Sequence, residues 1–168
     1  MMHPINITEA ISEADFVRVK KLIQEYLAWL IAEGGEGVRE TLLSQNIENE
    51  METLRQTYTK PNGSVFLVYH QEKAVAIAGI KRFSKNECEV KRMFVQQGSR
   101  GLGIGKLLLQ SCIDSAQKLN YERIKLDTLD FMRSAIKLYT DFGFVEIDSY
   151  RFNSHKEARY FELDLRNS

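Results

Sequence analysis

Apolar residues recur every three or four positions in the first third of the 168-residue chain, which predicts two helices. Ser12 and Asp15 have the spacing of a capping box at the start of the first helix, and Gly34-Gly35 ends it. The second predicted helix covers residues 43–58 and stops before the turn formers at residues 61–63. The apolar positions are Phe16, Val19, Ile23, Tyr26, Leu27 and Leu30, then Leu43, Ile47, Met51, Leu54 and Tyr58.

The middle of the chain contains short runs of apolar and β-branched residues, which predict strands. Residues 64–70 and 74–83 form two such runs, joined by a short polar connection over residues 71–73. A turn over residues 84–86 leads into a third strand that ends at Val95. Because short connections join antiparallel neighbours, we expect these three strands to form an antiparallel unit.

Helices and strands alternate in the rest of the chain. The whole order is two helices, three strands, helix, strand, helix and two strands, which predicts one mixed α/β domain over residues 1–168 with a mostly antiparallel sheet. The later elements are a helix over residues 104–119, a strand over 123–129, a helix over 131–142, and strands near 144–152 and 158–165.

Composition narrows the function classes. The chain is 43% hydrophobic and 27% charged, and its 23 basic and 23 acidic residues balance, which argues against a dedicated nucleic-acid binder. Three scattered histidines have no metal-ligand spacing, and no apolar run is long enough to predict export or membrane insertion. We expect a cytoplasmic protein without a metal, whose Cys88 and Cys112 are reduced and buried; a homodimer is left open.

A glycine-rich segment lies between the third predicted strand and the helix that follows it. Glycines at 101, 103 and 105 let the backbone approach a ligand, and the first turn of the helix leaves N–H groups free to bind an anion. The segment matches neither a P-loop, which needs glycine where Arg100 stands, nor the dinucleotide fingerprint, which needs glycine where Lys106 stands. It therefore predicts a phosphate site of another kind.

Two motifs give the chain a family resemblance. The pattern R-x-x-G-x-G at residues 100–105 resembles the pyrophosphate loop of the GNAT superfamily of acetyl-CoA-dependent N-acetyltransferases. The pattern A-x-x-x-Y-x-x-x-G-F at residues 135–144 is similar to the signature at the family's last helix, and residues 88–95 resemble its central strand. The resemblance is close over residues 88–165 and extends to the remainder only in the order of elements. It implies the GNAT fold and acetyl-CoA as acyl donor.

Acetyl transfer to an amine needs a base, because deprotonating an alkyl ammonium at pH 7 costs about 4.6 kcal/mol. Glu89 lies eleven residues before the loop arginine, the offset at which the histone-acetylating branch of the family carries its catalytic glutamate. Asp127 and Asp130 are competing bases at the end of a strand. Glu89 is otherwise a surface residue opposite a basic residue of the neighbouring strand, Lys81 or Arg82.

The resemblance assigns further residues. Tyr139 stands where the family places its general acid, which protonates the departing thiolate; the alternative is an apolar core position. Met132 stands where members often carry an asparagine that binds the pantetheine arm. Part of the usual binding of that arm is therefore absent or supplied by other residues. The acceptor-side residues are Tyr26, Trp29, Arg92 and Asp127. The expected acetyl-CoA residues are Phe94, Val95, Arg100, Gly101, Leu102, Gly103, Ile104, Gly105 and Lys106.

Three functions stay open at this point. The leading one is an N-acetyltransferase that transfers the acetyl group of acetyl-CoA to a primary amine of a small molecule by direct attack in a ternary complex. A protein or peptide N-acetyltransferase would use the same chemistry with an open acceptor channel. A non-catalytic acyl-CoA-binding regulator would bind acetyl-CoA but release no thiol with any amine.

Overall fold

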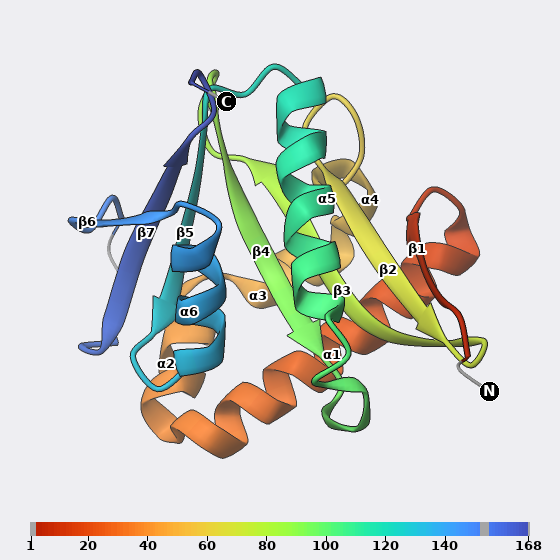
Figure 1. Ribbon diagram of the computed structural model, residues 1–168. Helices are drawn as coiled ribbons and strands as arrows, with labels where there is room; N and C mark the ends of the chain where they lie inside the picture. The colour runs from red at the N-terminus through yellow and green to blue at the C-terminus, as the bar shows by residue number, and fades with distance from the viewer. Residues whose placement is uncertain (1–2, 152–154, 168) are drawn as a thin grey trace.

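The computed structural model describes residues 3–151 and 155–167, in which the strands form one sheet (Figure 1). The strands are β1 (Ile5–Glu9), β2 (Ser64–His70), β3 (Lys73–Arg82), β4 (Glu87–Val95), β5 (Arg123–Leu129), β6 (Val145–Ile147) and β7 (Ala158–Asp164). Their spatial order is β1-β2-β3-β4-β5-β7-β6, and every neighbouring pair is antiparallel except β4 and β5. The predicted mixed α/β class with a mostly antiparallel sheet is confirmed.

Helices cover both faces of this sheet. They are α1 (Glu13–Gly34), α2 (Glu36–Ser44), α3 (Ile47–Glu52), α4 (Leu54–Thr57), α5 (Ile104–Lys118) and α6 (Arg133–Asp141). In Figure 1, α5 crosses in front of β2, β3 and β4, while α1 and the short helices after it lie behind the sheet. No helix within residues 3–151 and 155–167 is long and apolar enough to cross a membrane.

Alternation along β3 divides the core between the two faces. Ala78 and Ile80 are buried in the cluster that holds Leu108 of α5, whereas Ile77 is buried in the cluster that holds Val19 of α1. This follows from the two-residue period of a strand, which sends successive side chains to opposite faces. Burying a Val, Leu or Ile side chain such as these contributes about 1.5–3 kcal/mol. The predicted burial of the two free cysteines, Cys88 and Cys112, is confirmed.

The parallel pair β4 and β5 is joined along only part of its length. Residues 87–89 pair with residues 123–125, and beyond this point the two strands diverge (Figure 1). The pairing of β3 with β4 is also irregular there, because Ile77 pairs with Phe94 but Gly79 pairs with Lys91. The extra residue on β4 forms a bulge. The sheet therefore opens between β4 and β5, next to a local distortion of β4.

Three predictions about elements need correction. The chain begins with a strand, β1, that the sequence analysis missed; its five residues carry only a short apolar alternation and pair with β2 at the sheet edge. The predicted helix over residues 43–58 is wrong, because the chain forms three helices, α2, α3 and α4, from residue 36 onward. Asn46, with φ of 55°, separates α2 from α3, since asparagine tolerates the left-handed conformation better than most residues.

The strand expected near residues 144–152 is also shorter than predicted. It covers only Val145–Ile147, and residue 152 lies outside the described residues. The predicted end of the first helix is confirmed, because α1 ends at Gly34 and Gly35 caps it with φ of 74°. The capping box of Ser12 and Asp15 is also confirmed, with both reciprocal hydrogen bonds present.

Candidate functional site

The glycine segment forms a turn that leads directly into α5. Gly101 and Gly103 have φ of 82° and 78°, a conformation that strains any residue with a Cβ. Gly103 occupies the N-cap position of α5, and no described side chain caps this helix. The first N–H groups of α5 therefore remain available to an anion, and the helix dipole adds partial positive charge at the same place.

A groove with a volume of about 420 Å³ runs from this turn along β4 to α6. We call it the outer groove; it is lined by Trp29, Glu33, Met93, Phe94, Val95, Ser99, Arg100, Gly101, Gly103, Ile104, Gly105, Phe131, Met132, Arg133, Ser134, Ala135 and Leu138. The lining includes all the residues expected to bind acetyl-CoA except Leu102 and Lys106, which are exposed. Residues from both sequence motifs thus meet along one groove.

Arg100 shapes the mouth of the outer groove. Its guanidinium carbon lies 5.0 Å from the ring centroid of Trp29, a cation–π contact, and its Nε donates a hydrogen bond to the carbonyl of Val95 at 3.0 Å. Trp29 was expected on the acceptor side, but in the structure it lines the outer groove. Its ring lies in an aromatic cluster with Tyr26 and Phe94.

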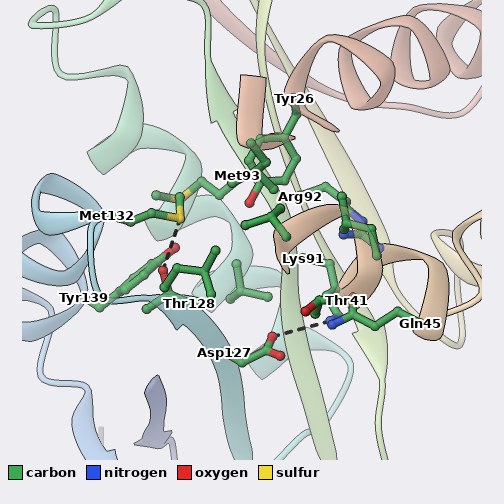
Figure 2. A pocket seen from close by; sticks show the side chains of 15 residues that line it. Tyr26, Thr41, Gln45, Lys91, Arg92, Met93, Asp127, Thr128, Met132 and Tyr139 are labelled. Atoms are coloured by element: carbon green, nitrogen blue, oxygen red, sulfur yellow. Dashed lines mark hydrogen bonds and ion pairs between the residues drawn. The ribbon is translucent and has the colours of Figure 1, made fainter. Parts of the chain in front are cut away.

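A second, smaller cavity of about 80 Å³ lies deeper between the diverging strands (Figure 2). We call it the inner cavity; it is lined by Tyr26, Leu30, Val38, Thr41, Leu42, Gln45, Val90, Lys91, Arg92, Met93, Asp127, Thr128, Leu129, Met132 and Tyr139. Met93 and Met132 line the outer groove as well, so the two spaces adjoin at these side chains. Of the predicted site residues, Tyr26, Arg92, Asp127 and Tyr139 come together here.

The bulge in β4 explains why this strand contributes consecutive side chains to the inner cavity. In a regular strand, Lys91 and Arg92 would point to opposite faces. Arg92 has φ of 59°, an uncommon conformation for a residue with a side chain, which costs about 1–2 kcal/mol. Both basic side chains therefore line one cavity, as Figure 2 shows.

Lys91 is a buried ammonium between two carboxylates. Its side chain is only 6% exposed, and its Nζ lies 3.6 Å from Oδ1 of Asp127 and 3.8 Å from Oε2 of Glu89. Burial lowers the pKa of Lys91, although the two nearby carboxylates act in the opposite direction. The charged form is thus held in a site that solvates it poorly.

Arg92 pairs with a carboxylate from the helical layer. Its Nε donates a hydrogen bond to Oε2 of Glu50 on α3 at 2.7 Å, and both side chains are less than a tenth exposed. Lys81 of β3 adds a longer contact to Glu50, at 3.8 Å. Burial alone would raise the pKa of Glu50, but the charge and hydrogen bond of Arg92 outweigh it and the pKa is lowered.

Glu89, the residue matched to the family's glutamate, does not line the inner cavity. Its Oε2 accepts a hydrogen bond from the hydroxyl of Tyr150 at 2.8 Å and forms an ion pair with Arg151. In the sheet it pairs with Lys81, as the structural alternative expected, but it is 1% exposed and therefore not a surface residue. Asp130, another candidate base, is exposed and is bound by Arg159 at 3.1 Å.

Two tyrosines complete the inner cavity. Tyr139 is buried, with its ring against Phe144 and Phe161, and burial raises the pKa of its hydroxyl far above the usual value. Burial raises the pKa of Tyr26 to about 12. Both hydroxyls therefore stay protonated at neutral pH, as a proton donor must. Thr128 donates a hydrogen bond to the sulfur of Met132 at 3.4 Å, fixing the residue that replaces the family's asparagine.

Sequence reasoning missed several residues of the inner cavity and its surroundings. Lys91 stands next to Arg92, a predicted site residue, but the alternation of a regular strand places its side chain on the opposite face of the sheet. Thr41 and Gln45 lie at the end of α2, in a segment whose helix limits were predicted wrongly. Glu50 could have been suspected only from its partner, because nothing in its local sequence distinguishes it from other helical glutamates.

Comparisons with known proteins agree with this geometry. The model of the family described as Acetyltransferase (GNAT) family matches residues 36–144. The chain is 32% identical to an uncharacterized N-acetyltransferase of Schizosaccharomyces pombe, over 98% of this chain and 99% of that protein. It is 34% identical to N-acetylaspartate synthetase of Danio rerio, over 58% of this chain and only 36% of that protein.

A solved structure supports the fold. An acetyltransferase of the GNAT family from Staphylococcus aureus matches with a TM-score of 0.74 and 26% identity, over 97% of this chain and 100% of that chain. The similarity therefore includes the N-terminal elements, for which the sequence offered only an order of helices and strands.

Proposed function

This chain belongs to the GNAT acetyltransferase family and is an acyltransferase, and from this premise we propose that it transfers the acetyl group of acetyl-CoA to a primary amine of a small molecule. The observation that carries the proposal is the junction of two spaces at Met93 and Met132. The outer groove begins at a phosphate-binding turn, and the inner cavity is lined by ionisable groups. A donor and an acceptor bound in these spaces would meet where β4 and β5 diverge.

The outer groove fits acetyl-CoA. The uncapped start of α5 and the glycines of the turn suit a pyrophosphate, because N–H groups and the helix dipole stabilise negative charge there. Past Glu89, the edge of β4 that faces β5 is not paired with that strand, so its peptide groups are available to an extended pantetheine arm. Acetyl-CoA supplies the acetyl group as a thioester, from which the thiol of CoA departs.

We assign the proton-accepting role to Asp127. Among the carboxylates considered from the sequence, Asp127 lines the inner cavity, whereas Glu89 and Asp130 do not. The ammonium of Lys91 lies 3.6 Å from Oδ1 of Asp127, so this carboxylate borders the cavity beside a cation. Glu89 acting as base, directly or through water, is the rival assignment, and its contacts with Tyr150 and Arg151 favour a structural role instead.

Tyr139 is the proton donor in this proposal. It lines the inner cavity from α6, and Met132, which borders both spaces, lies about two helical turns before it at the N-cap of the same helix. Its hydroxyl stays protonated at neutral pH and can donate its proton to the departing thiolate, although burial raises the pKa of Tyr139 and makes it a weaker acid than a free phenol. The phenolate left on Tyr139 takes up the proton that the attacking nitrogen loses as the amide forms, so the step balances.

The small size of the inner cavity supports a small-molecule acceptor. Its volume is about 80 Å³, and side chains from α1, α2, β4, β5 and α6 line it, a size and lining that suit a small acceptor. One relative, N-acetylaspartate synthetase, bears a name that refers to an acetylated amino acid, which is consistent with an acceptor of this size.

The proposal is tested by incubating the protein with acetyl-CoA and a library of primary amines and titrating the free thiol of CoA. Release that depends on a small amine, with the N-acetylated product identified by mass spectrometry, would support it. Release only with lysine-containing peptides would identify a peptide N-acetyltransferase instead. Binding of acetyl-CoA without release for any amine or peptide would indicate a non-catalytic regulator.

A further inference from the structure

The inner cavity contains a buried ammonium that lacks hydrogen-bond acceptors among the described residues. Lys91 is 6% exposed, yet its two carboxylate neighbours lie 3.6 and 3.8 Å away, beyond the roughly 2.7–3.2 Å of an N–H···O hydrogen bond. A charged group withdrawn from water is strongly destabilised unless such bonds replace its hydration. Since Lys91 lines the cavity, an oxygen-bearing ligand there would supply them.

Arg92 offers a second cation to the same space. Its hydrogen bond to Glu50 uses Nε, and none of the described residues accepts a hydrogen bond from its two terminal amino groups. The bulge in β4 brings this side chain and that of Lys91 to one cavity. An ammonium beside a guanidinium with free amino groups is a recognition site for an oxyanion.

The ion pairs around the cavity form two groups. Lys81 and Arg92 share Glu50, whereas Lys91 and Arg151 share Glu89, with Asp127 beside Lys91. An amine must be neutral when it attacks a thioester. A carboxylate on the acceptor would offer oxygen acceptors to Lys91 and Arg92, whereas a polyamine would add positive charge next to two cations.

We infer that the acceptor carries a carboxylate in addition to its amine, as an amino acid does, and that Lys91 and Arg92 bind this carboxylate while Asp127 faces the amine. The inference rests on the proposed function and adds the chemical class of the acceptor. It also explains what the bulge of β4 does, because in a regular strand one of the two cations would point away from the inner cavity.

The wild-type protein tests the inference with matched pairs of acceptors. We compare the rates of thiol release at saturating acetyl-CoA for L-alanine and L-alaninamide, and for β-alanine and β-alaninamide. L-Aspartate and spermidine are tested as further acceptors. We expect kcat/KM for the better carboxylate to exceed that of its amide at least tenfold. Alaninamide has the less basic amine and is more deprotonated at neutral pH, so amine basicity alone would favour the amide.

Variants locate the preference in the protein. Lys91→Met should reduce the ratio of carboxylate to amide kcat/KM at least tenfold, mainly through a higher KM for the carboxylate, whereas Lys91→Arg should retain part of the preference because it keeps the charge. Lys81→Met is the matched control. It removes a cation that contacts Glu50, is 28% exposed and does not line the cavity, so the ratio should stay near wild type. Melting temperature and acetyl-CoA affinity, measured for each variant, exclude unfolding as the cause.

The outcomes separate this inference from the proposed function. Equal or faster turnover of the amides or of spermidine would overturn the carboxylate subsite but leave small-molecule acetyl transfer intact. A wild-type preference for carboxylates that survives in folded Lys91→Met would also overturn the assignment to Lys91. No thiol release with any acceptor, despite acetyl-CoA binding, would refute the proposed function and the inference together.

Discussion

Glu50 on α3 and Arg92 on β4 form a buried ion pair, with 2.7 Å between Oε2 and Nε. The pair joins a short helix to the one position in β4 where a non-glycine residue has φ of 59°. A left-handed residue persists in a strand only when its surroundings hold it there. The contact therefore ties α3 to the bulge that gives the inner cavity its shape.

Replacement of Glu50 by Gln should destabilise the protein by about 3 kcal/mol, because it leaves the charge of Arg92 buried without its partner. Urea denaturation at pH 7 measures the free energy of unfolding. Lys81→Met, which removes the longer and more exposed contact to the same glutamate, should cost less than about 1 kcal/mol. Equal losses in the two variants would contradict a dominant role for the Glu50–Arg92 pair.

The effect of Glu50 should also depend on pH. The pKa of Glu50 is lowered below its ordinary value of 4.5 in the folded protein, so the unfolded chain binds a proton first as the pH falls. The contribution of this group to stability is thus complete well above pH 4.5 and is lost as the pH falls through the folded-state pKa. The stability difference between wild type and Glu50→Gln, measured by denaturation from pH 7 to pH 3, should shrink on acidification. A constant difference would contradict the lowered pKa.

Replacement of Gly103 by Asp should abolish the rise in melting temperature that we expect from acetyl-CoA, because a carboxylate and a strained backbone would occupy the turn proposed to bind its pyrophosphate. Thermal shift with and without acetyl-CoA measures this. Gly98→Asp is the control, since Gly98 is exposed, has open space around its Cα and does not line the outer groove. An unchanged shift in folded Gly103→Asp would remove the turn from the donor site.

Replacement of Tyr139 by Phe should lower kcat while acetyl-CoA affinity stays within a few-fold of wild type, because protonation of the thiolate occurs only as the bond breaks. Calorimetry and steady-state rates provide the two measurements. Tyr121→Phe is a matched control, since its hydroxyl donates to the carbonyl of Asn62 at 2.7 Å, away from both spaces. That variant should lose about 1 kcal/mol of stability and keep its kcat. An unaltered kcat in Tyr139→Phe would refute the role of its hydroxyl as proton donor.

Replacement of Asp127 by Asn should lower kcat about 100-fold, the lower end of the range for general base catalysis, and higher pH should restore part of the rate by supplying free amine. Glu89→Gln is the direct comparison. It removes the charge that pairs with Arg151 and should lower stability more than kcat. A large loss of kcat in Glu89→Gln, with near-normal turnover in Asp127→Asn, would reverse the two assignments.

The sequence by itself determined the features that contiguous residues encode. The glycine turn at residues 100–105 needs only its own backbone freedom and the helix that follows, so its place at the outer groove was predictable. The same holds for Tyr139, which a motif within one helix identifies, and for the capping box of α1. Periodicity also predicted most strands, because alternation reports burial directly.

Only the tertiary structure decided which charged side chains line the inner cavity. The bulge at Arg92 depends on the pairing of β4 with β3 and on Glu50, which lies 42 residues earlier in the chain. A single extra residue in a strand reverses the face of its neighbours, and no local pattern reports that reversal. Pairing between distant segments fixes the direction of each side chain. For this reason the sequence predicted neither that Lys91 lines the inner cavity nor that Glu89 contacts Tyr150 and Arg151.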